Sequence, residues 1–320
     1  MFGMYTCSVH ISWDYNLITS TTRGSSSLER SSRIPPCDKR VISRALPLRF
    51  FSPTRGRRIR LKGGIPLSNK VLVAVDFDHT LIDDNSDTYI QKLAPDGKFP
   101  AEMRERYVPG SWTIFMRVMF RYLYENGVRP DLLLETIGEI PLLTGMREWL
   151  QTLNEYGYFE VAIISDANTV FIEHILYRQG VRHLVHEVFS NYAQFDGNGC
   201  LTIQEFHRND WCKMCPQNLC KSKVVADYID RRKKQGVNLN RIVYIGDGNN
   251  DYCPAANCKR GDLVLARKGF ALDRRICKRP INARSVTWEN GLDILKSITQ
   301  HFGDQSGGAT STGTVSPSDN

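Results

Sequence analysis

Runs of apolar, mostly β-branched residues predict the strands of this protein. The first is residues 71–75, Val-Leu-Val-Ala-Val, and two aspartates, Asp76 and Asp78, follow it directly. A short run without polar interruptions is typical of a strand that is buried on both faces, as in a parallel sheet. Similar runs predict further strands near residues 160–165, 186–190, 242–247, 262–266 and 285–288.

Between the first two predicted strands, the apolar residues change to a spacing of three and four. This spacing predicts amphipathic helices, and because aromatic stripes of this kind are usually core, we assign no ligand to them. One stripe comprises Trp112, Phe115, Met116, Met119, Phe120 and Leu123, and a second covers residues 144–153. Further helices are predicted near residues 168–179, 219–235 and 290–302. Their alternation with strands indicates βαβ units and an α/β fold.

The two ends of the chain show no sustained periodicity. Residues 1–70 hold 13 Lys and Arg and 3 Asp and Glu, a net charge of +10. Residues 71–320 therefore hold 29 Lys and Arg and 31 Asp and Glu, a net charge of −2. Because the basic charge is confined to this segment, we expect no nucleic-acid partner. Residues 1–69 fit a disordered basic arm best, with a mitochondrial transit peptide or a misplaced start codon as alternatives. Residues 303–320, rich in Gly, Ser and Thr, are also expected to be disordered.

Sequence signals and cysteine usage indicate the cellular compartment in which the protein is expected. No run of 18 apolar residues occurs, so we expect no membrane span, and the start of the chain lacks a signal-peptide core. The nine cysteines are unevenly placed and no Asn-x-Ser/Thr sequon is present. A reducing, cytoplasmic interior fits this usage best. The sequence carries no signal for the oligomeric state.

Polar residues stand at the ends of three predicted strands. Asp76 and Asp78 end the first, Ser165 ends the second, and Asp247 and Asp251 follow a later one. Carboxyl ends of parallel strands meet at one sheet edge, so we expect one site there. Carboxylates this close need a cation between them or a proton on one of them, and clustered carboxylate oxygens suit Mg²⁺. A turn that caps the next helix is the alternative for the first two aspartates.

Taken together, these motifs resemble the haloacid dehalogenase (HAD) phosphohydrolase superfamily. The strings at residues 83–88, 164–168, 212–221 and 246–254 are similar to its PHOSPHO family, which includes phosphoethanolamine/phosphocholine phosphatases and pyridoxal phosphate phosphatases. The likeness spans residues 71–302. It implies a HAD-like Rossmannoid parallel sheet, with a core at residues 70–86 and 158–302, and an inserted helical cap at about residues 87–157.

The resemblance also implies roles for the strand-end residues. Asp76 is expected to be the nucleophile that forms an aspartyl-phosphate, and Asp78 to protonate the leaving oxygen and then act as base on water. Mg²⁺ is expected to be held by Asp76, the backbone carbonyl of Asp78, and Asp247. Asp251 is then a direct or water-mediated fourth ligand.

Further residues are implied as substrate contacts. Ser165 is expected to bind a phosphate oxygen, and Asp87 and Asp166 to contact a cationic group such as an ammonium or pyridinium. A helix N-cap is the alternative for Asp166. Lys221 is expected to reach the phosphate, with Lys223 as the alternative, since both lie where a helix is predicted to start.

Two other segments carry metal-like patterns. Residues 194–205 match an EF-hand loop at Gly199 and Glu205, but the first position is Gln194, and a polar hairpin turn is the better interpretation. His207, Cys212, Cys215 and Cys220 offer four zinc ligands, yet the usual second paired motif is missing. A metal-free loop is therefore favoured over structural zinc.

The sequence thus predicts a Mg²⁺-dependent phosphomonoesterase whose partner is a small phosphorylated, amine-containing metabolite. Pyridoxal 5′-phosphate is favoured, and phosphoethanolamine or phosphocholine is the alternative. A phosphotransferase of the same fold and a catalytically silent phosphate-binding protein are the rival hypotheses.

Overall fold

The structure is a computed structural model, and it describes residues 69–105, 107–108 and 110–303. The predicted N-terminal arm and the tail, residues 1–68 and 304–320, lie outside the described residues, and so does the hypothesis of mitochondrial import. Within the described ranges, no helix is both long and apolar enough to cross a membrane.

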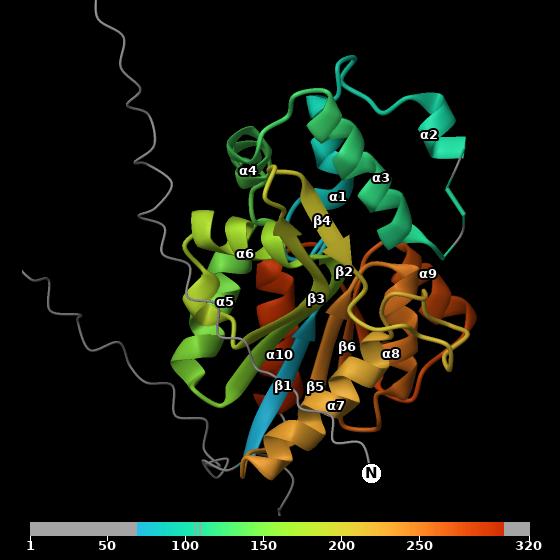
Figure 1. Ribbon diagram of the computed structural model, residues 1–320. Coiled ribbons are helices and arrows are strands. Elements are labelled where there is room, and N and C mark those ends of the chain that lie inside the picture. The colour runs from blue at the N-terminus through green and yellow to red at the C-terminus, as the bar shows by residue number, and fades with distance from the viewer. Residues whose placement is uncertain (1–68, 106, 109, 304–320) are drawn as a thin grey trace, which may run out of the picture. The chain divides into compact units, whose positions relative to one another are not determined.

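A single seven-stranded sheet forms the centre of the molecule, with the strand order β4-β3-β2-β1-β5-β6-β7 (Figure 1). All neighbouring strands are parallel except β3 and β4. The strands are β1 (Asn69–Val75), β2 (Phe159–Asn168), β3 (Glu187–Phe195), β4 (Leu201–Gln204), β5 (Asn238–Gly246), β6 (Leu263–Arg267) and β7 (Arg284–Trp288). The predicted α/β fold with a parallel sheet is therefore confirmed.

Helices occupy the connections between the strands. Between β1 and β2 lie α1 (Ser86–Tyr89), the 3-10 turn η2 (Ile90–Leu93), α2 (Ala101–Glu105), α3 (Trp112–Glu125), α4 (Pro130–Gly138) and α5 (Met146–Tyr156). After β2 come α6 (Thr169–Arg178), η3 (Arg182–Leu184), α7 (Lys221–Lys234), η4 (Asn249–Asp251), α8 (Tyr252–Asn257), α9 (Ala271–Lys278) and α10 (Gly291–Gly303). The short helices α8 and α9 were not predicted, because segments of six and eight residues span only about two turns, too few repeats for a helical pattern to be identified.

The central strand β1 shows why the sheet is covered on both faces. Val71, Val73 and Val75 pack into one hydrophobic cluster, together with α5, α6 and α10. Leu72 and Ala74 point the other way and pack with α7, α8 and α9. All five side chains are buried. A strand with both faces buried needs an unbroken apolar run, which is the pattern that predicted it.

The segment predicted as the cap has two parts. In Figure 1, α1 to α4 gather beyond the carboxyl end of β1, whereas α5 packs with α10 beside the sheet. The two connections to α1–α4 run side by side, because Ile82 forms an antiparallel bridge with Leu142, and the N–H of Leu143 donates to the carbonyl of Leu81 at 3.1 Å. This two-stranded neck bounds the helices that lie over the sheet edge.

The predicted polar hairpin at residues 194–205 is confirmed. β3 and β4 pair antiparallel around a turn in which Asp196 Oδ1 accepts the N–H groups of Asn198 and Cys200, both at 2.9 Å. Gly199 has a φ of +87°, a conformation that L side chains rarely adopt. Arg117 of α3 donates from Nε to a carbonyl of β4 at 2.8 Å, so the hairpin also supports α3.

A buried carboxylate joins β2 to α7. Glu160 is 2% exposed and accepts hydrogen bonds from Arg232 Nε at 2.8 Å, from Arg232 Nη2 at 2.9 Å, and from the hydroxyl of Tyr228. Burial by itself raises the pKa of Glu160, but the bonds from Arg232 and Tyr228 outweigh it, so the pKa lies below its usual value. Glu160 is therefore ionised and ties α7 to the sheet.

Arg232→Ala is expected to lower the free energy of unfolding by roughly 3 kcal/mol, since it removes both hydrogen bonds from a cation to the buried carboxylate and leaves only Lys70, at 3.7 Å, as an ion-pair partner. Arg231→Ala on the same helix, which removes a surface pair with Glu187, should lower it by about 1 kcal/mol or less. Urea titration at neutral pH measures both. Because the pKa of Glu160 is lower in the folded than in the unfolded state, these bonds stabilise the fold fully at pH values above the unfolded-state pKa. The stabilisation is lost as the pH falls through the folded-state pKa. Equal effects of the two variants would contradict the assignment.

Candidate active site

Three neighbouring strands bring polar residues together at the carboxyl edge of the sheet. The last residue of β1 pairs with Ile163 of β2 and with Ile245 of β5. The next N–H, that of Asp76, donates to the carbonyl of Ile245 at 2.9 Å. Ser165 and Asp247 each lie two residues beyond these pairing partners, so the register places both beside the end of β1.

Lys221, the first residue of α7, lies against Asp76. Its Nζ is 2.8 Å from Asp76 Oδ2 and 2.7 Å from Asp251 Oδ1, and its side chain is 1% exposed. Burial by itself lowers the pKa of Lys221, but the two carboxylates outweigh burial and raise it well above its usual value. Lys223 instead pairs with Asp227 at the surface. Of the two lysines, Lys221 is the cation beside Asp76.

Asp251 accepts hydrogen bonds on both of its carboxylate oxygens. Oδ1 accepts from Lys221 and, at 2.6 Å, from the hydroxyl of Tyr244. Oδ2 accepts the N–H groups of Asp247 at 3.0 Å and Gly248 at 2.8 Å. With so many acceptor positions used, Asp251 is suited to orienting Lys221 and the acidic turn. Tyr244 was missed at the sequence level because it lies inside an apolar strand.

The first glycine of the Gly-Asp-Gly motif makes this arrangement sterically feasible. A Cβ at Gly246 would lie 2.4 Å from Cγ of Asp251, which is closer than real contacts allow. Any other residue would push the Asp251 carboxylate away from Lys221. The glycine in this motif therefore permits a close side-chain approach.

The carboxylates around Asp76 fit a divalent cation. Oxygens of Asp76, Asp247 and Asp251 all lie within 4.8 Å of one another. Burial and then Asp251 raise the pKa of Asp76 well above its usual value, against the effect of Lys221, and the same two causes raise the pKa of Asp247 to about 7. A cation between these oxygens would keep them ionised, and hard oxygen donors match Mg²⁺.

Asp78 and Ser165 lie in environments that suit proton donation. Asp78 Oδ1 accepts the N–H of Ser86 at 2.9 Å, and burial, followed by the charge of Asp87, raises the pKa of Asp78 well above its usual value. Ser165 is 1% exposed, and its Oγ accepts the N–H of Ala167 at 3.3 Å. As the acceptor in that bond, the hydroxyl keeps its proton for another acceptor.

Asp87, in α1, lies between α3 and the end of β2. It is 2% exposed, and it accepts hydrogen bonds from Trp112 Nε1 of α3 at 2.7 Å and from Asn168 Nδ2 at 3.4 Å. Burial raises the pKa of Asp87 to about 7, although the bond from Trp112 lowers it. Trp112 was predicted only as part of a core stripe, so its contact with Asp87 was missed.

Asp166 belongs to the same group of charges. It is partly buried, and its charge acts on Asp76, Asp78 and Asp87. The helix that follows is capped by Asn168, whose side chain accepts the N–H of the third residue along at 3.0 Å. The N-cap alternative for Asp166 is therefore wrong, because the cap lies two residues later.

Arg267, at the end of β6, holds the loop that follows Asp78. Its Nη1 donates to the carbonyl of His79 at 2.5 Å, and its guanidinium lies 4.4 Å from the ring centre of Phe270. His79 has a φ of +52°, which is uncommon for a residue other than glycine. Arg267 thus stabilises a strained turn, a role that the sequence pattern did not indicate.

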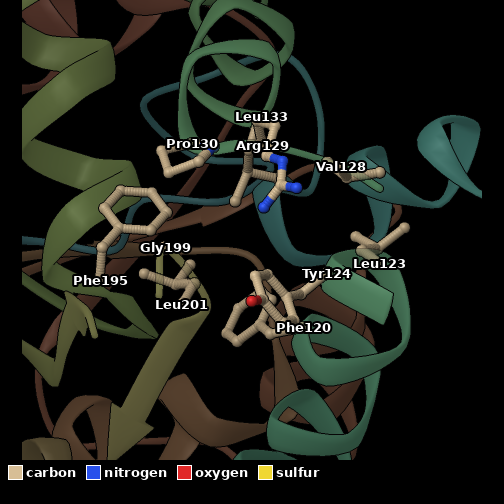
Figure 2. Close-up of a pocket in the computed structure, with 10 residues that line it drawn as sticks. All are labelled: Phe120, Leu123, Tyr124, Val128, Arg129, Pro130, Leu133, Phe195, Gly199 and Leu201. Carbon is tan, nitrogen blue, oxygen red and sulfur yellow. The ribbon is translucent and has the colours of Figure 1, made fainter. Parts of the chain in front are cut away.

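Two hollows in the described residues lie away from these carboxylates. Figure 2 shows a mostly apolar cleft between α3, α4 and the β3–β4 hairpin, with a cavity of about 10 Å³, room for about one water molecule. A wider hollow of about 280 Å³ lies along α3. Neither is lined by Asp76 or its neighbours. The first is lined by Phe120, Leu123, Tyr124, Val128, Arg129, Pro130, Leu133, Phe195, Gly199 and Leu201.

Known proteins resemble this chain in sequence and in fold. A family model described as "Putative Phosphatase" matches residues 71–302. The chain is 42% identical over 235 residues to pyridoxal phosphate phosphatase PHOSPHO2 of Bos taurus, covering 72% of this chain and 97% of that protein. It is 37% identical over 238 residues to a human phosphoethanolamine/phosphocholine phosphatase, covering 72% and 89%. A phosphoserine phosphatase solved as a phospho-aspartyl intermediate analogue shares the fold, with 19% identity, a TM-score of 0.51, and coverage of 72% and 99%.

The parallel sheet and the acidic strand ends, with these relatives, define a phosphoric monoester hydrolase with the HAD fold. Within this class, the chain belongs to the PHOSPHO family of phosphatases. The resemblance inferred from the sequence motifs is thereby confirmed.

Lys221→Met is expected to lower the turnover number for phosphate release about 100- to 1000-fold, because the variant lacks the cation beside Asp76. Lys223→Met, two residues along the same helix, should stay within about twofold, since its ion pair is exposed. Steady-state phosphate release compares the two, and thermal melting checks that both variants fold. Similar losses in both, or no loss in Lys221→Met, would contradict the assignment of Lys221.

Proposed function

We propose that this protein is a Mg²⁺-dependent phosphomonoesterase that works through an aspartyl-phosphate on Asp76. The observation that carries the proposal is the contact of 2.8 Å between Asp76 Oδ2 and Lys221 Nζ in a buried site at the sheet edge. A fixed cation beside a buried carboxylate holds it ready for attack and offsets the charge of an incoming phosphate. The proposed metal ligands are Asp76, the backbone carbonyl of Asp78, and Asp247, with Asp251 reached through water.

In the proposed reaction, an oxygen of Asp76 attacks phosphorus as the bond from phosphorus to the leaving oxygen breaks. Asp78, whose raised pKa favours the protonated form, gives its proton to the leaving oxygen. Water then attacks the aspartyl-phosphate, gives a proton back to Asp78, and releases inorganic phosphate. Ser165 donates a hydrogen bond to a phosphate oxygen. Mg²⁺, when bound, supplies positive charge that stabilises the phosphoryl oxygens.

The proposed substrate is a small phosphate ester with a cationic group. Asp87 and Asp166 supply negative charge near Asp78, and Trp112 adds an aromatic ring on the cap side. These groups suit a pyridinium as well as an ammonium. Pyridoxal 5′-phosphate is favoured because the relative named for it is 42% identical, against 37% for the relative named for phosphoethanolamine and phosphocholine. Phosphoethanolamine remains the second candidate, since paired carboxylates also suit a primary ammonium.

Phosphate release by the purified protein tests this proposal. We expect release that requires Mg²⁺, stops with a chelator, and falls at least about 1000-fold in Asp76→Asn, which keeps the size of the side chain but removes the nucleophile. The ranking of kcat/KM among pyridoxal 5′-phosphate, phosphoethanolamine, phosphocholine and phosphoserine identifies the preferred substrate. Turnover by Asp76→Asn at the wild-type rate, or release unaffected by chelation, would refute the mechanism.

Asp87 is expected to make substrate selection depend on pH. Its pKa of about 7 means that the carboxylate is mostly ionised at pH 8 and mostly protonated at pH 6. The KM for phosphoethanolamine should therefore rise about tenfold from pH 8 to pH 6, as the ionised fraction falls. Glycerol 2-phosphate, which titrates in the same range but carries no cation, is the control substrate. In Asp87→Asn, the ratio of kcat/KM for phosphoethanolamine to kcat/KM for glycerol 2-phosphate should be low and independent of pH. If this variant kept the pH dependence of the wild-type protein, Asp87 would be excluded as its cause.

A further inference from the structure

Four cysteine sulfurs meet beside the active site. Cys212, Cys215 and Cys220 come from the loop between β4 and α7, and Cys253 comes from the first turn of α8. Their Sγ atoms all lie within 4.8 Å of one another, and those of Cys212 and Cys253 are 3.6 Å apart. Each of these cysteines is a free thiol, and a disulfide would need a sulfur separation of about 2.0 Å. The cluster is thus a set of separate thiols.

This spacing matches a tetrahedral metal site. A zinc–sulfur bond of about 2.3 Å places the sulfurs of a tetrahedral Cys₄ site about 3.8 Å apart. Cys212 and Cys215 also have the Cys-x-x-Cys spacing, while Cys220 and Cys253 are buried. Four thiolates complete the coordination of zinc and leave no open position for substrate. Such a set is typical of a structural metal site.

One buried side chain shapes the loop that carries two of the cysteines. Asn209 is 6% exposed, and its Nδ2 donates to the carbonyls of Cys212 at 2.9 Å, Cys215 at 3.3 Å and Pro216 at 3.0 Å. Its Oδ1 accepts the N–H of Cys212 at 3.0 Å. The loop is therefore folded around its cysteines by bonds that do not involve the sulfurs, as expected of residues that support metal ligands.

His207, one of the four zinc ligands that the sequence offered, has another role. Its Nε2 accepts the N–H of Cys220 at 2.8 Å, so the lone pair of that nitrogen is already used. His207 orients Cys220 within the loop. Cys253 takes the fourth place in the cluster, and it was missed because a whole helix and strand separate it from Cys220 along the chain.

We infer that Cys212, Cys215, Cys220 and Cys253 bind a structural Zn²⁺ ion. Cys220 directly precedes Lys221, and Cys253 follows Asp251 by two residues. The zinc would therefore fasten the start of α7 to the start of α8, which are the two points that bring Lys221 against Asp251 and Asp76. The site goes beyond the proposed phosphatase reaction, because it takes a soft metal at sulfur ligands and touches no substrate.

The metal content of the purified full-length chain tests the inference directly. After passage over a weak chelator in reducing buffer, wild-type protein should hold about one zinc per chain by mass spectrometry of the metal. Cys215→Ser should lose it. Cys277→Ser, an exposed thiol outside the cluster, and Asp247→Asn, at the carboxylate site, should both keep it. Cobalt exchanged into the wild-type protein should show the intense charge-transfer absorption of thiolate ligands and the visible bands of tetrahedral Co²⁺.

A second measurement needs no variant and does not depend on phosphatase activity. Stripping zinc from the wild-type protein with a strong zinc-selective chelator should lower the melting temperature by at least about 5 °C, and Zn²⁺, but not Mg²⁺, should restore it. Wild-type protein that holds no zinc, that holds iron instead, or that joins these cysteines in disulfides would overturn the inference. Equal zinc content in Cys215→Ser and Cys277→Ser would overturn it as well. A zinc-loaded protein without phosphate release would leave the inference standing and refute only the proposed function.

Discussion

The ion pairs of Lys221 with Asp76 and Asp251 are the interaction on which the rest of the site depends. A lysine that is 1% exposed can remain charged only where carboxylates compensate for its lost hydration. The end of β1, the start of α7 and the turn before α8 must therefore meet at one point. Gly246 makes the meeting sterically feasible, and the hydroxyl of Tyr244 completes the bonds to Asp251. Loss of Lys221 would leave the buried carboxylates of Asp76 and Asp251 without their shared cation.

The same site holds more negative charge than one lysine can balance. Burial first, and then neighbouring carboxylates, raises the pKa values of Asp76, Asp78 and Asp247. This charge and the hard oxygen donors are what make the cluster suited to the proposed Mg²⁺. The cysteine cluster beside it differs in donor chemistry, because sulfur ligands favour zinc. The proposed Mg²⁺ and Zn²⁺ would therefore use different ligands and would not compete for one site.

The sequence predicted the parts of the site that lie at strand ends, because apolar runs and the acids that follow them are local signals. The resemblance favoured Lys221 over Lys223, but the local pattern alone does not separate them, since both stand at a helix start and only tertiary burial distinguishes them. The sequence also missed the contact of Trp112 with Asp87, because a helix stripe looks the same whether it packs on a core or on a carboxylate. Cys253 was missed because the cluster that contains it forms only when α7 and α8 pack together. Burial and long-range packing are the two properties that a local pattern does not carry.

In the proposed mechanism, the location of Asp87 separates the residues that choose the substrate from those that carry out the reaction. Asp76, Asp247 and Lys221 come from the sheet and from a helix packed on it, whereas Asp87 and its partner Trp112 come from helices beyond the two-stranded neck at Ile82 and Leu142. Changes in those helices can alter which leaving group fits without disturbing the buried ion pairs. Because Asn168 of β2 also donates to Asp87, α1 is tied to the sheet edge that holds the proposed catalytic residues. A family with one reaction and several named substrates is what this division of the site would produce.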